Sequence, residues 1–394
     1  MLPGHIARRK TVLISRETLN HAVERGIISA SQRDAVIALD TMPDLPATAS
    51  ISDENLRLIG GGNDLFVTVG IGMLFAGILF SLQALPAIDR TIGAVIVAVL
   101  IWAVAEFVTR QKRMRLASTV LGIGFVAGIG VLLGDHVSSQ AGLEQLNGNL
   151  VTLFALRSKA GWLGSLAAGG VAGAAALYFW RFRVPIMAAI IALAMTAMAF
   201  LWVALLLYDG VTSGQVALPT SEQLPMVMER ALLVPLACGV IVFLVAVALD
   251  LHDRERFTIW SDCAFWLHVV SAPMLVHPLF ILATGQATAV GTIEPGAGAA
   301  ISLGLLIAGF VYVALAIDRR SLLVPTFAYF GSIGVYYLFD HTANATGIPP
   351  FALILLMIGA LVIMFGAGWQ RIRGLTVGST LPTSVLAKLP PIKV

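Results

Sequence analysis

Long apolar blocks separated by short polar turns dominate the chain from residue 65 onward. Each block has about 20 residues, and at about 1.5 Å of rise per residue this lets an α-helix cross about 30 Å of hydrocarbon. The pattern therefore predicts an all-α, polytopic transmembrane helix bundle of about ten spans. The expected spans are about 65–85, 92–109, 116–134, 161–180, 184–208, 231–249, 260–283, 297–317, 321–339 and 350–369.

The first 64 residues have a different pattern, with short amphipathic stretches and many polar positions. Leu19 and Val23 lie four residues apart, which places them on one face of a short helix. Ser29 followed three residues later by Gln32 has the capping-box pattern and predicts the start of a second helix. We therefore expect a small cytoplasmic helical hairpin. The predicted organisation is a hairpin module and linker at 1–64, a ten-span domain at 65–369 and a cytoplasmic tail at 370–394.

Composition and charge agree with a membrane protein. Hydrophobic residues make up 58% of the chain and charged residues only 12%, whereas soluble proteins carry about 25% charged residues. With the N-terminus inside, 21 of the 25 Lys and Arg residues fall on the predicted inner side and four on the outer side. Because basic loops stay cytoplasmic, both termini are expected inside. The same distribution accounts for the net charge of +3, so the expected partner is the lipid bilayer and not nucleic acid.

The Gly26-Ile27-Ile28-Ser29 stretch with Gln32, placed before many apolar spans, resembles a pattern in bacterial predicted polytopic inner-membrane proteins of unknown function. These proteins also carry an N-terminal helical-hairpin module and a short tail rich in Leu and Pro, like Leu389-Pro390-Pro391 here. The resemblance implies a bacterial inner membrane. It implies no activity.

The predicted inner turns recur at similar spacing. Using Arg113, Arg183, Arg256 and Arg320 as markers, the steps are 70, 73 and 64 residues. One interpretation is a duplicated helical hairpin in parallel topology, and repeats of this kind build many transporters. The alternative is that any membrane protein with short loops has basic turns at this spacing.

The seventh predicted span holds the main candidate site. Polar groups in a bilayer core are costly, by about 2.5–3.5 kcal/mol for a charge on insertion scales, so they mark candidate functional positions. Histidine changes charge near neutral pH, and proline inside a helix frees backbone carbonyls. The candidates are Asp262, His268, Ser271, Pro273 and His277. Together they suggest a proton or solute path. The alternative is that each histidine hydrogen-bonds a neighbouring helix and fixes packing.

Other polar positions are secondary candidates. Glu106 lies near the inner end of the second span and is expected to pair with Arg110 at i+4. Asp340 and His341 open a predicted outer loop. Asp318-Arg319-Arg320 is interpreted as a solvated turn, and Trp369 as one of several aromatic anchors at the membrane interface.

Two functions fit these features. The preferred one is a transporter or channel-like protein for a small solute, proton or lipid. The alternative is a non-catalytic membrane scaffold or sensor that docks a cytoplasmic partner, or a second copy of the chain, through residues 1–64. An enzyme is not expected, since no acid, base and nucleophile meet at one depth, and no cofactor or metal motif occurs in the sequence.

Overall fold

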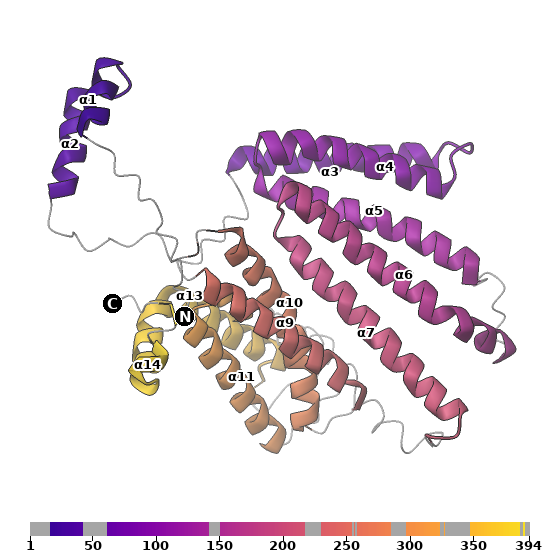
Figure 1. Cartoon of the computed structure of the whole chain (residues 1–394). Coiled ribbons are helices and arrows are strands. Elements are labelled where there is room, and N and C mark those ends of the chain that lie inside the picture. Colours follow the sequence, from indigo (N-terminus) through magenta and orange to yellow (C-terminus); the bar gives the residue numbers. More distant parts are fainter. Residues whose placement is uncertain are drawn as a thin grey trace, which may run out of the picture. The chain divides into compact units, whose positions relative to one another are not determined.

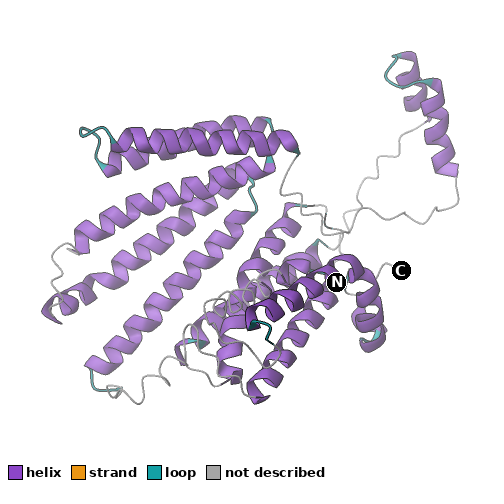
Figure 2. Cartoon of the chain, turned by 180° about the vertical axis from the view of Figure 1, so that it is seen from behind, coloured by secondary structure: helices purple, strands orange, loops and turns teal. Residues whose placement is uncertain are grey.

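The structure is a computed structural model, and every regular element in the part of the chain that it describes is helical (Figure 2). The chain divides into two compact units, residues 1–53 and residues 54–394. The described residues are 16–41, 61–141, 150–216, 230–253, 256, 258–284, 297–323, 327, 347–386 and 389–390.

The first unit contains helices α1, Arg16–Glu24, and α2, Ala30–Thr41. Gly26 ends the first helix in the left-handed region, with φ 67°, where glycine has no Cβ to clash. The predicted capping box is confirmed: the Ser29 amide donates to Gln32 Oε1 at 2.8 Å, and the Gln32 amide donates to Ser29 Oγ at 3.2 Å. These two bonds satisfy amide groups that the first turn of α2 leaves without helical partners.

The second unit is a set of long apolar helices. They are α3 Gly62–Gln83, α4 Arg90–Ala105, α5 Arg115–Ala141, α6 Leu150–Phe182, α7 Ile186–Thr212, α9 Leu233–His252, α10 Ile259–Thr284, α11 Ala297–Ile317 and α13 Pro350–Thr380. A π-helical turn, Glu106–Gln111, extends α4. A 3₁₀ turn, Arg320–Leu322, follows α11, and the short helix α14, Thr383–Leu386, follows α13.

Eight helices in the described part are long and apolar enough to cross a membrane, which fits a multi-pass membrane protein. They match eight of the ten predicted spans. The predicted span 297–317 corresponds to α11, in which the apolar stretch Gly304–Ile317 is shorter than the eight spans. Most of the predicted span 321–339 lies outside the described residues. The count of ten therefore stays a prediction.

Large apolar side chains face outward along these helices. Phe66, Met73 and Phe80 on α3 are more than 70% exposed, and Ile363 on α13 is 72% exposed. Contiguous apolar surface on this scale is costly in water. Contact with lipid removes that cost, which is what a membrane-embedded bundle requires.

Helices that follow one another in the chain pack side by side, from α3 to α7 and on through α9, α10, α11 and α13 (Figure 1). Two apolar cores result. The first joins α3 to α7 around Leu121, Tyr178 and Met187. The second joins α10, α11 and α13 around Ala272 and Leu315.

A carboxylate from α3 caps a neighbouring helix. Asp64 is 3% exposed, and its two oxygens accept the backbone amides of Leu116 at 2.9 Å and Ala117 at 3.1 Å. Both amides belong to the first turn of α5, which has no helical acceptors for them. Asp64 therefore fixes the start of α3 against the start of α5.

Four turns at one set of helix ends share a backbone feature. Arg113, Arg183, Arg256 and Asp318 all have φ between 52° and 57°, a left-handed conformation that costs L-residues about 1–2 kcal/mol. Three of these are the markers of the predicted repeat, and the fourth lies two residues before the last marker. The recurrence favours the repeated-hairpin interpretation, with α4–α5, α6–α7 and α9–α10 as hairpins.

The C-terminal span is longer than predicted. The sequence placed its end at residue 369 and a tail at 370–394, but α13 continues to Thr380. The continuation contains Arg373, which is 0% exposed. Its charge is compensated inside the protein, as described below, so the helix does not have to end where the charged residues begin.

Candidate functional site

Charged side chains meet in the interior of the second unit, where α9, α10, α13 and the end of α11 come together. We call this group the ionic cluster. None of its side chains is more than 8% exposed. Its members are Asp250, Arg256, Ser261, His268, Asp318, Arg319, Trp369 and Arg373.

The centre of the ionic cluster is an ion pair between α9 and the residue after the α11 turn. Arg319 Nε donates to both oxygens of Asp250, at 3.1 and 3.0 Å, and its Nη2 also contacts Asp250 Oδ1. The same Nη2 donates to the carbonyl of Ser261 at 3.1 Å and to its hydroxyl at 2.8 Å. Bidentate pairing of this kind is the strongest arrangement for a guanidinium and a carboxylate.

His268 joins the pair from α10. Its Nε2 lies 2.9 Å from Asp250 Oδ2, and its ring packs edge-on against Phe243 at 5.4 Å between centroids. Because the Asp250 carboxylate can only accept, Nε2 of the neutral imidazole carries the hydrogen. His268 Nδ1 is then an acceptor, and it is buried without a hydrogen-bond partner in the described part of the chain.

The second carboxylate of the ionic cluster is Asp318, which directly precedes Arg319 in the sequence. Asp318 Oδ1 accepts from Trp369 Nε1 at 2.6 Å. Arg256 Nη1 lies 3.5 Å from Asp318 Oδ2, and Arg373 Nε lies 4.0 Å from Oδ1. The residue thus connects the turn after α9, the end of α11 and helix α13.

The left-handed conformation of Asp318 makes this geometry possible. Its amide donates to Leu315 O at 3.3 Å, and the Arg319 amide donates to Ala314 O at 2.9 Å, which is the Schellman pattern at a helix C-terminus. The chain therefore reverses sharply at the end of α11. Two successive residues of opposite charge are directed inward toward different partners.

The arginines and aspartates of the ionic cluster leave one positive charge in excess, since there are three arginines and two aspartates. Backbone carbonyls at the end of α11 compensate. Arg256 donates to Asp318 O at 2.8 Å, and Arg373 donates to Leu315 O at 2.8 Å. The C-terminal end of a helix carries a partial negative charge of about half a unit. Arginine at this position is therefore stabilised by the helix end as well as by the carboxylates.

The structure separates the residues that the sequence grouped in the seventh span. His268 is in the ionic cluster, and Ser271 is buried one turn away, with its hydroxyl donating to the His268 carbonyl at 3.2 Å. Asp262 is exposed on the first turn of α10, and no described residue hydrogen-bonds to it. α10 continues as one helix through Pro273, which is exposed. His277 is half-buried and lies roughly 13 Å further along the axis than His268.

The secondary candidates lie elsewhere. Glu106 contacts Arg110 at 3.5 Å, as predicted, and is closer to Arg181 of α6, at 2.7 Å. It therefore ties the end of α4 to the end of α6. Asp340 and His341 lie outside the described residues.

Two interpretations from sequence were wrong. Asp318 and Arg319 are buried, 5% and 2% exposed, and do not form a solvated turn. Trp369 is 2% exposed and hydrogen-bonded to Asp318, so it is no interfacial anchor.

The key residues that sequence reasoning missed are Asp250, Arg319 and Arg373. Asp250 falls directly after a predicted span, where charged residues ordinarily meet water. Arg319 and Arg373 are near other basic residues, which makes them resemble cytoplasmic loop charges. The one available signal was Asp318-Arg319 directly after an apolar block, because an acid and a base side by side need different partners once they are buried.

Among the described residues, no group of three or more His, Cys, Asp or Glu side chains is arranged to hold a metal ion. No protein-family profile, curated protein or solved structure matches the chain.

Proposed function

We propose that the protein is a multi-pass membrane transporter that moves protons, alone or together with a small solute, and that His268 and Asp250 form its proton-binding pair. The observation that carries the proposal is the His268 ring. One nitrogen is fixed on a buried carboxylate, while the other is buried without a partner in the described part of the chain.

The arrangement favours reversible protonation. A proton that arrives at His268 Nδ1 produces an imidazolium, whose Nε2–H still donates to Asp250. The new positive charge lies next to a carboxylate that already binds Arg319. Competition between these two cations for one carboxylate gives the pair two states that differ in the strength of the Asp250–Arg319 contact. A change of that kind is what couples proton binding to helix movement.

The position of the pair also fits a path. Ser261, which binds Arg319, lies at the turn end of α10, and His268 lies roughly 10 Å deeper along the helix axis. The ionic cluster therefore extends from a helix end into the apolar part of the bundle. Intramembrane titratable groups are functional candidates by default because of their cost in lipid.

The test uses purified protein in liposomes that contain a pH-sensitive dye. A potassium diffusion potential drives protons inward, and dye fluorescence reports the flux. We expect flux above that of empty liposomes, and at least a tenfold loss, corresponding to about 1.4 kcal/mol, for His268→Gln. Glutamine can still donate to Asp250 but cannot carry a proton.

His277→Gln is the matched control, because it changes a half-buried histidine of the same helix outside the ionic cluster. Its flux should stay near that of the unmodified protein. Flux equal to that of empty liposomes for the unmodified protein, or equal flux for His268→Gln and His277→Gln, would overturn the proposal.

We further propose ten spans with both termini in the cytoplasm of a bacterial inner membrane. The distribution of Lys and Arg supports this topology. Reporter fusions at Gly291 and Thr342 should give an outside signal, whereas fusions at Arg254 and at the C-terminus should give an inside signal. A cytoplasmic signal at Thr342 would refute the ten-span count.

One observation favours the alternative function, a scaffold or sensor. Residues 1–53 form a compact unit of their own, and Ile27, in the turn between α1 and α2, is 71% exposed. This is an apolar contact point suited to a cytoplasmic partner or a second copy. A photo-crosslinker at position 27, activated in intact cells, should yield a discrete adduct if this unit docks a partner. A crosslinked adduct, together with a proton flux equal to that of empty liposomes, would favour the scaffold or sensor over the transporter.

A further inference from the structure

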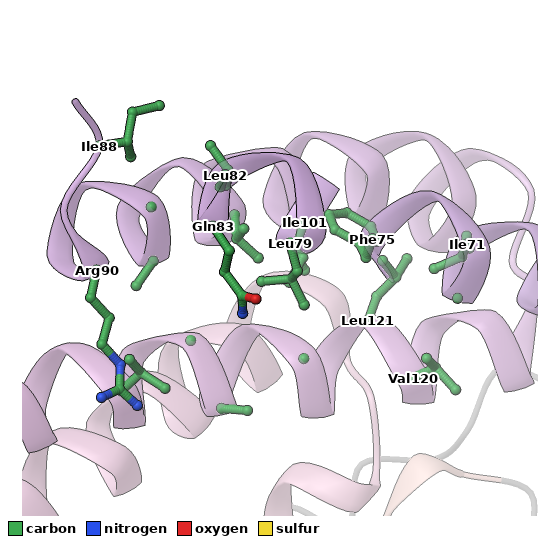
Figure 3. Close-up of a pocket in the computed structure, with 18 of the residues that line it drawn as sticks. Ile71, Phe75, Leu79, Leu82, Gln83, Ile88, Arg90, Ile101, Val120 and Leu121 are labelled. Atoms are coloured by element: carbon green, nitrogen blue, oxygen red, sulfur yellow. The ribbon is translucent and has the colours of Figure 1, made fainter. Parts of the chain in front are cut away.

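A second site lies far along the chain from the ionic cluster, in the first helices of the bundle. Helices α3, α4 and α5 line an open pocket of about 720 Å³ (Figure 3). Its wall is apolar over most of its length. Typical lining residues are Ile71, Phe75, Leu79, Val97, Ile101 and Leu121.

The length of the pocket matches one leaflet of a bilayer. Along α5 the lining extends from Val120 to Val131, a rise of roughly 16 Å. The hydrocarbon core is about 30 Å thick, so half of it is about 15 Å. An extended acyl chain of one leaflet would therefore occupy the pocket from end to end.

Polar side chains occur at one end only. Gln83 at the end of α3 and Arg90 at the start of α4 are directed into this end of the pocket (Figure 3). Both lie at helix termini, where the chain leaves the apolar segment. The polar end is therefore at the level expected for lipid headgroups, and the apolar end points toward the bilayer centre.

The polar end carries both signs of charge. Arg90 Nη1 lies 3.7 Å from Asp135 Oδ1, and the Arg90 side chain is 78% exposed. The other oxygen of Asp135, Oδ2, is buried without a hydrogen-bond partner among the described residues. Asp89 is already engaged, because it accepts the Ile92 amide at the start of α4, at 2.7 Å. Asp135 does not line the pocket itself, but its side chain is 27% exposed beside Arg90. A headgroup at this end would therefore meet both a cation and a carboxylate.

We propose that this pocket binds one acyl chain of a phospholipid whose headgroup carries a primary amine. The phosphate would contact the Arg90 guanidinium, which suits phosphate oxygens. The ammonium would donate to the Asp135 carboxylate, whose side chain is 27% exposed. A quaternary amine has no N–H to donate, and an uncharged polyol headgroup provides no cation, so both fit this end less well.

Glycine creates part of the space. A Cβ added at Gly72, which lines the pocket, would have no atom within 4 Å. Gly77 on the same helix also has no atom within 4 Å, but it does not line the pocket. The two positions make a matched pair, because leucine at either one adds the same side chain to an exposed part of α3 and only one of them fills the pocket.

The experiment is native mass spectrometry of the full-length protein in detergent, titrated with lipids that have identical acyl chains. Phosphatidylethanolamine should bind about tenfold more tightly than phosphatidylcholine or phosphatidylglycerol, as expected when one charge-assisted hydrogen bond is gained. Gly72→Leu should weaken binding of all three lipids, while Gly77→Leu should bind like the unmodified protein. Asp135→Asn should remove the preference for phosphatidylethanolamine, and Arg90→Gln should weaken all three phospholipids.

Equal binding by Gly72→Leu and Gly77→Leu would overturn the pocket as the site. Equal affinity for the three lipids in the unmodified protein would overturn the headgroup assignment. Circular dichroism checks the fold of each variant, and Arg90→Gln, a change of an exposed side chain, decides the question if Gly72→Leu does not fold. The inference is independent of the proposed proton path, since His268→Gln should retain phosphatidylethanolamine binding.

Discussion

Replacing Asp250 by asparagine tests whether the ionic cluster is held together by charge. The substitution keeps the shape of the side chain and removes its charge. Arg319, 2% exposed, then loses its bidentate carboxylate partner. Removing one partner of a buried ion pair costs about 3–5 kcal/mol, because the remaining charge is left uncompensated. Arg319 keeps its contacts with Ser261, so we expect a loss near the lower end, about 3 kcal/mol in the free energy of unfolding.

Replacing the other partner of the ion pair, Arg319, should lower the free energy of unfolding by less. In Arg319→Met the buried Asp250 carboxylate has lost its arginine partner, and protonation of this carboxylate at low pH neutralises the site. Proton uptake by the folded protein stabilises it as pH falls. The stability deficit of Arg319→Met should therefore shrink at low pH, whereas that of Asp250→Asn should not. The double variant should be more stable than the sum of the single effects predicts, by about 2 kcal/mol of coupling.

The assay is reversible unfolding in mixed micelles, followed by circular dichroism, for both single variants and the double variant. The same cycle on Arg157 and Asp209 is the control. This pair has the same bidentate chemistry, but the Asp209 side chain is 51% exposed, so solvent screens it and no measurable coupling is expected. Additive effects at Asp250 and Arg319, or equal coupling in the two cycles, would refute the claim that burial gives the central pair its strength.

Three further predictions concern other parts of the bundle. Asp64→Ala should lower the free energy of unfolding by about 1–2 kcal/mol, because the first turn of α5 loses its cap, and thermal unfolding in detergent measures this; Asp34→Ala, an exposed carboxylate outside the bundle, is the control. Arg113→Gly should raise stability by about 1 kcal/mol, since glycine adopts a φ of 52° without strain; an unchanged or lower unfolding temperature would contradict this explanation. Trp369→Phe should cost about 1–3 kcal/mol, because Asp318 Oδ1 loses a buried donor, and a matched Trp162→Phe change at a 70% exposed residue should have little effect.

The sequence predicted the helical elements well, because about 20 apolar residues in a row have few alternatives to a membrane helix. The capping box at Ser29 was predictable for a similar reason, since both of its hydrogen bonds are local. The end of α13 was not predictable. It depends on Arg373 reaching the carbonyl of Leu315 at the end of another helix, and no local pattern encodes a contact between such distant residues.

The candidate site was predicted only in part. His268 stood out because a titratable group inside an apolar block is visible in one sequence window. Asp250 did not, because its position at the edge of a block suggests water as its partner. Whether an edge charge faces water or a neighbouring helix is decided by tertiary packing, which brings α9, α10 and the end of α11 together.

The buried arginines bear on the topology argument itself. Arg256 and Arg319 were counted on predicted inner loops and Arg373 in the predicted cytoplasmic tail, yet their side chains pair inside the protein. Setting these three aside still leaves 18 basic residues on the predicted inner side against four on the outer side. Orientation is chosen as the chain inserts, before the bundle packs, so a basic residue that is later buried still acts on that choice. In the proposed topology the same three arginines act twice, first by favouring the inner side for their segments and then by holding α9, α10, α11 and α13 together.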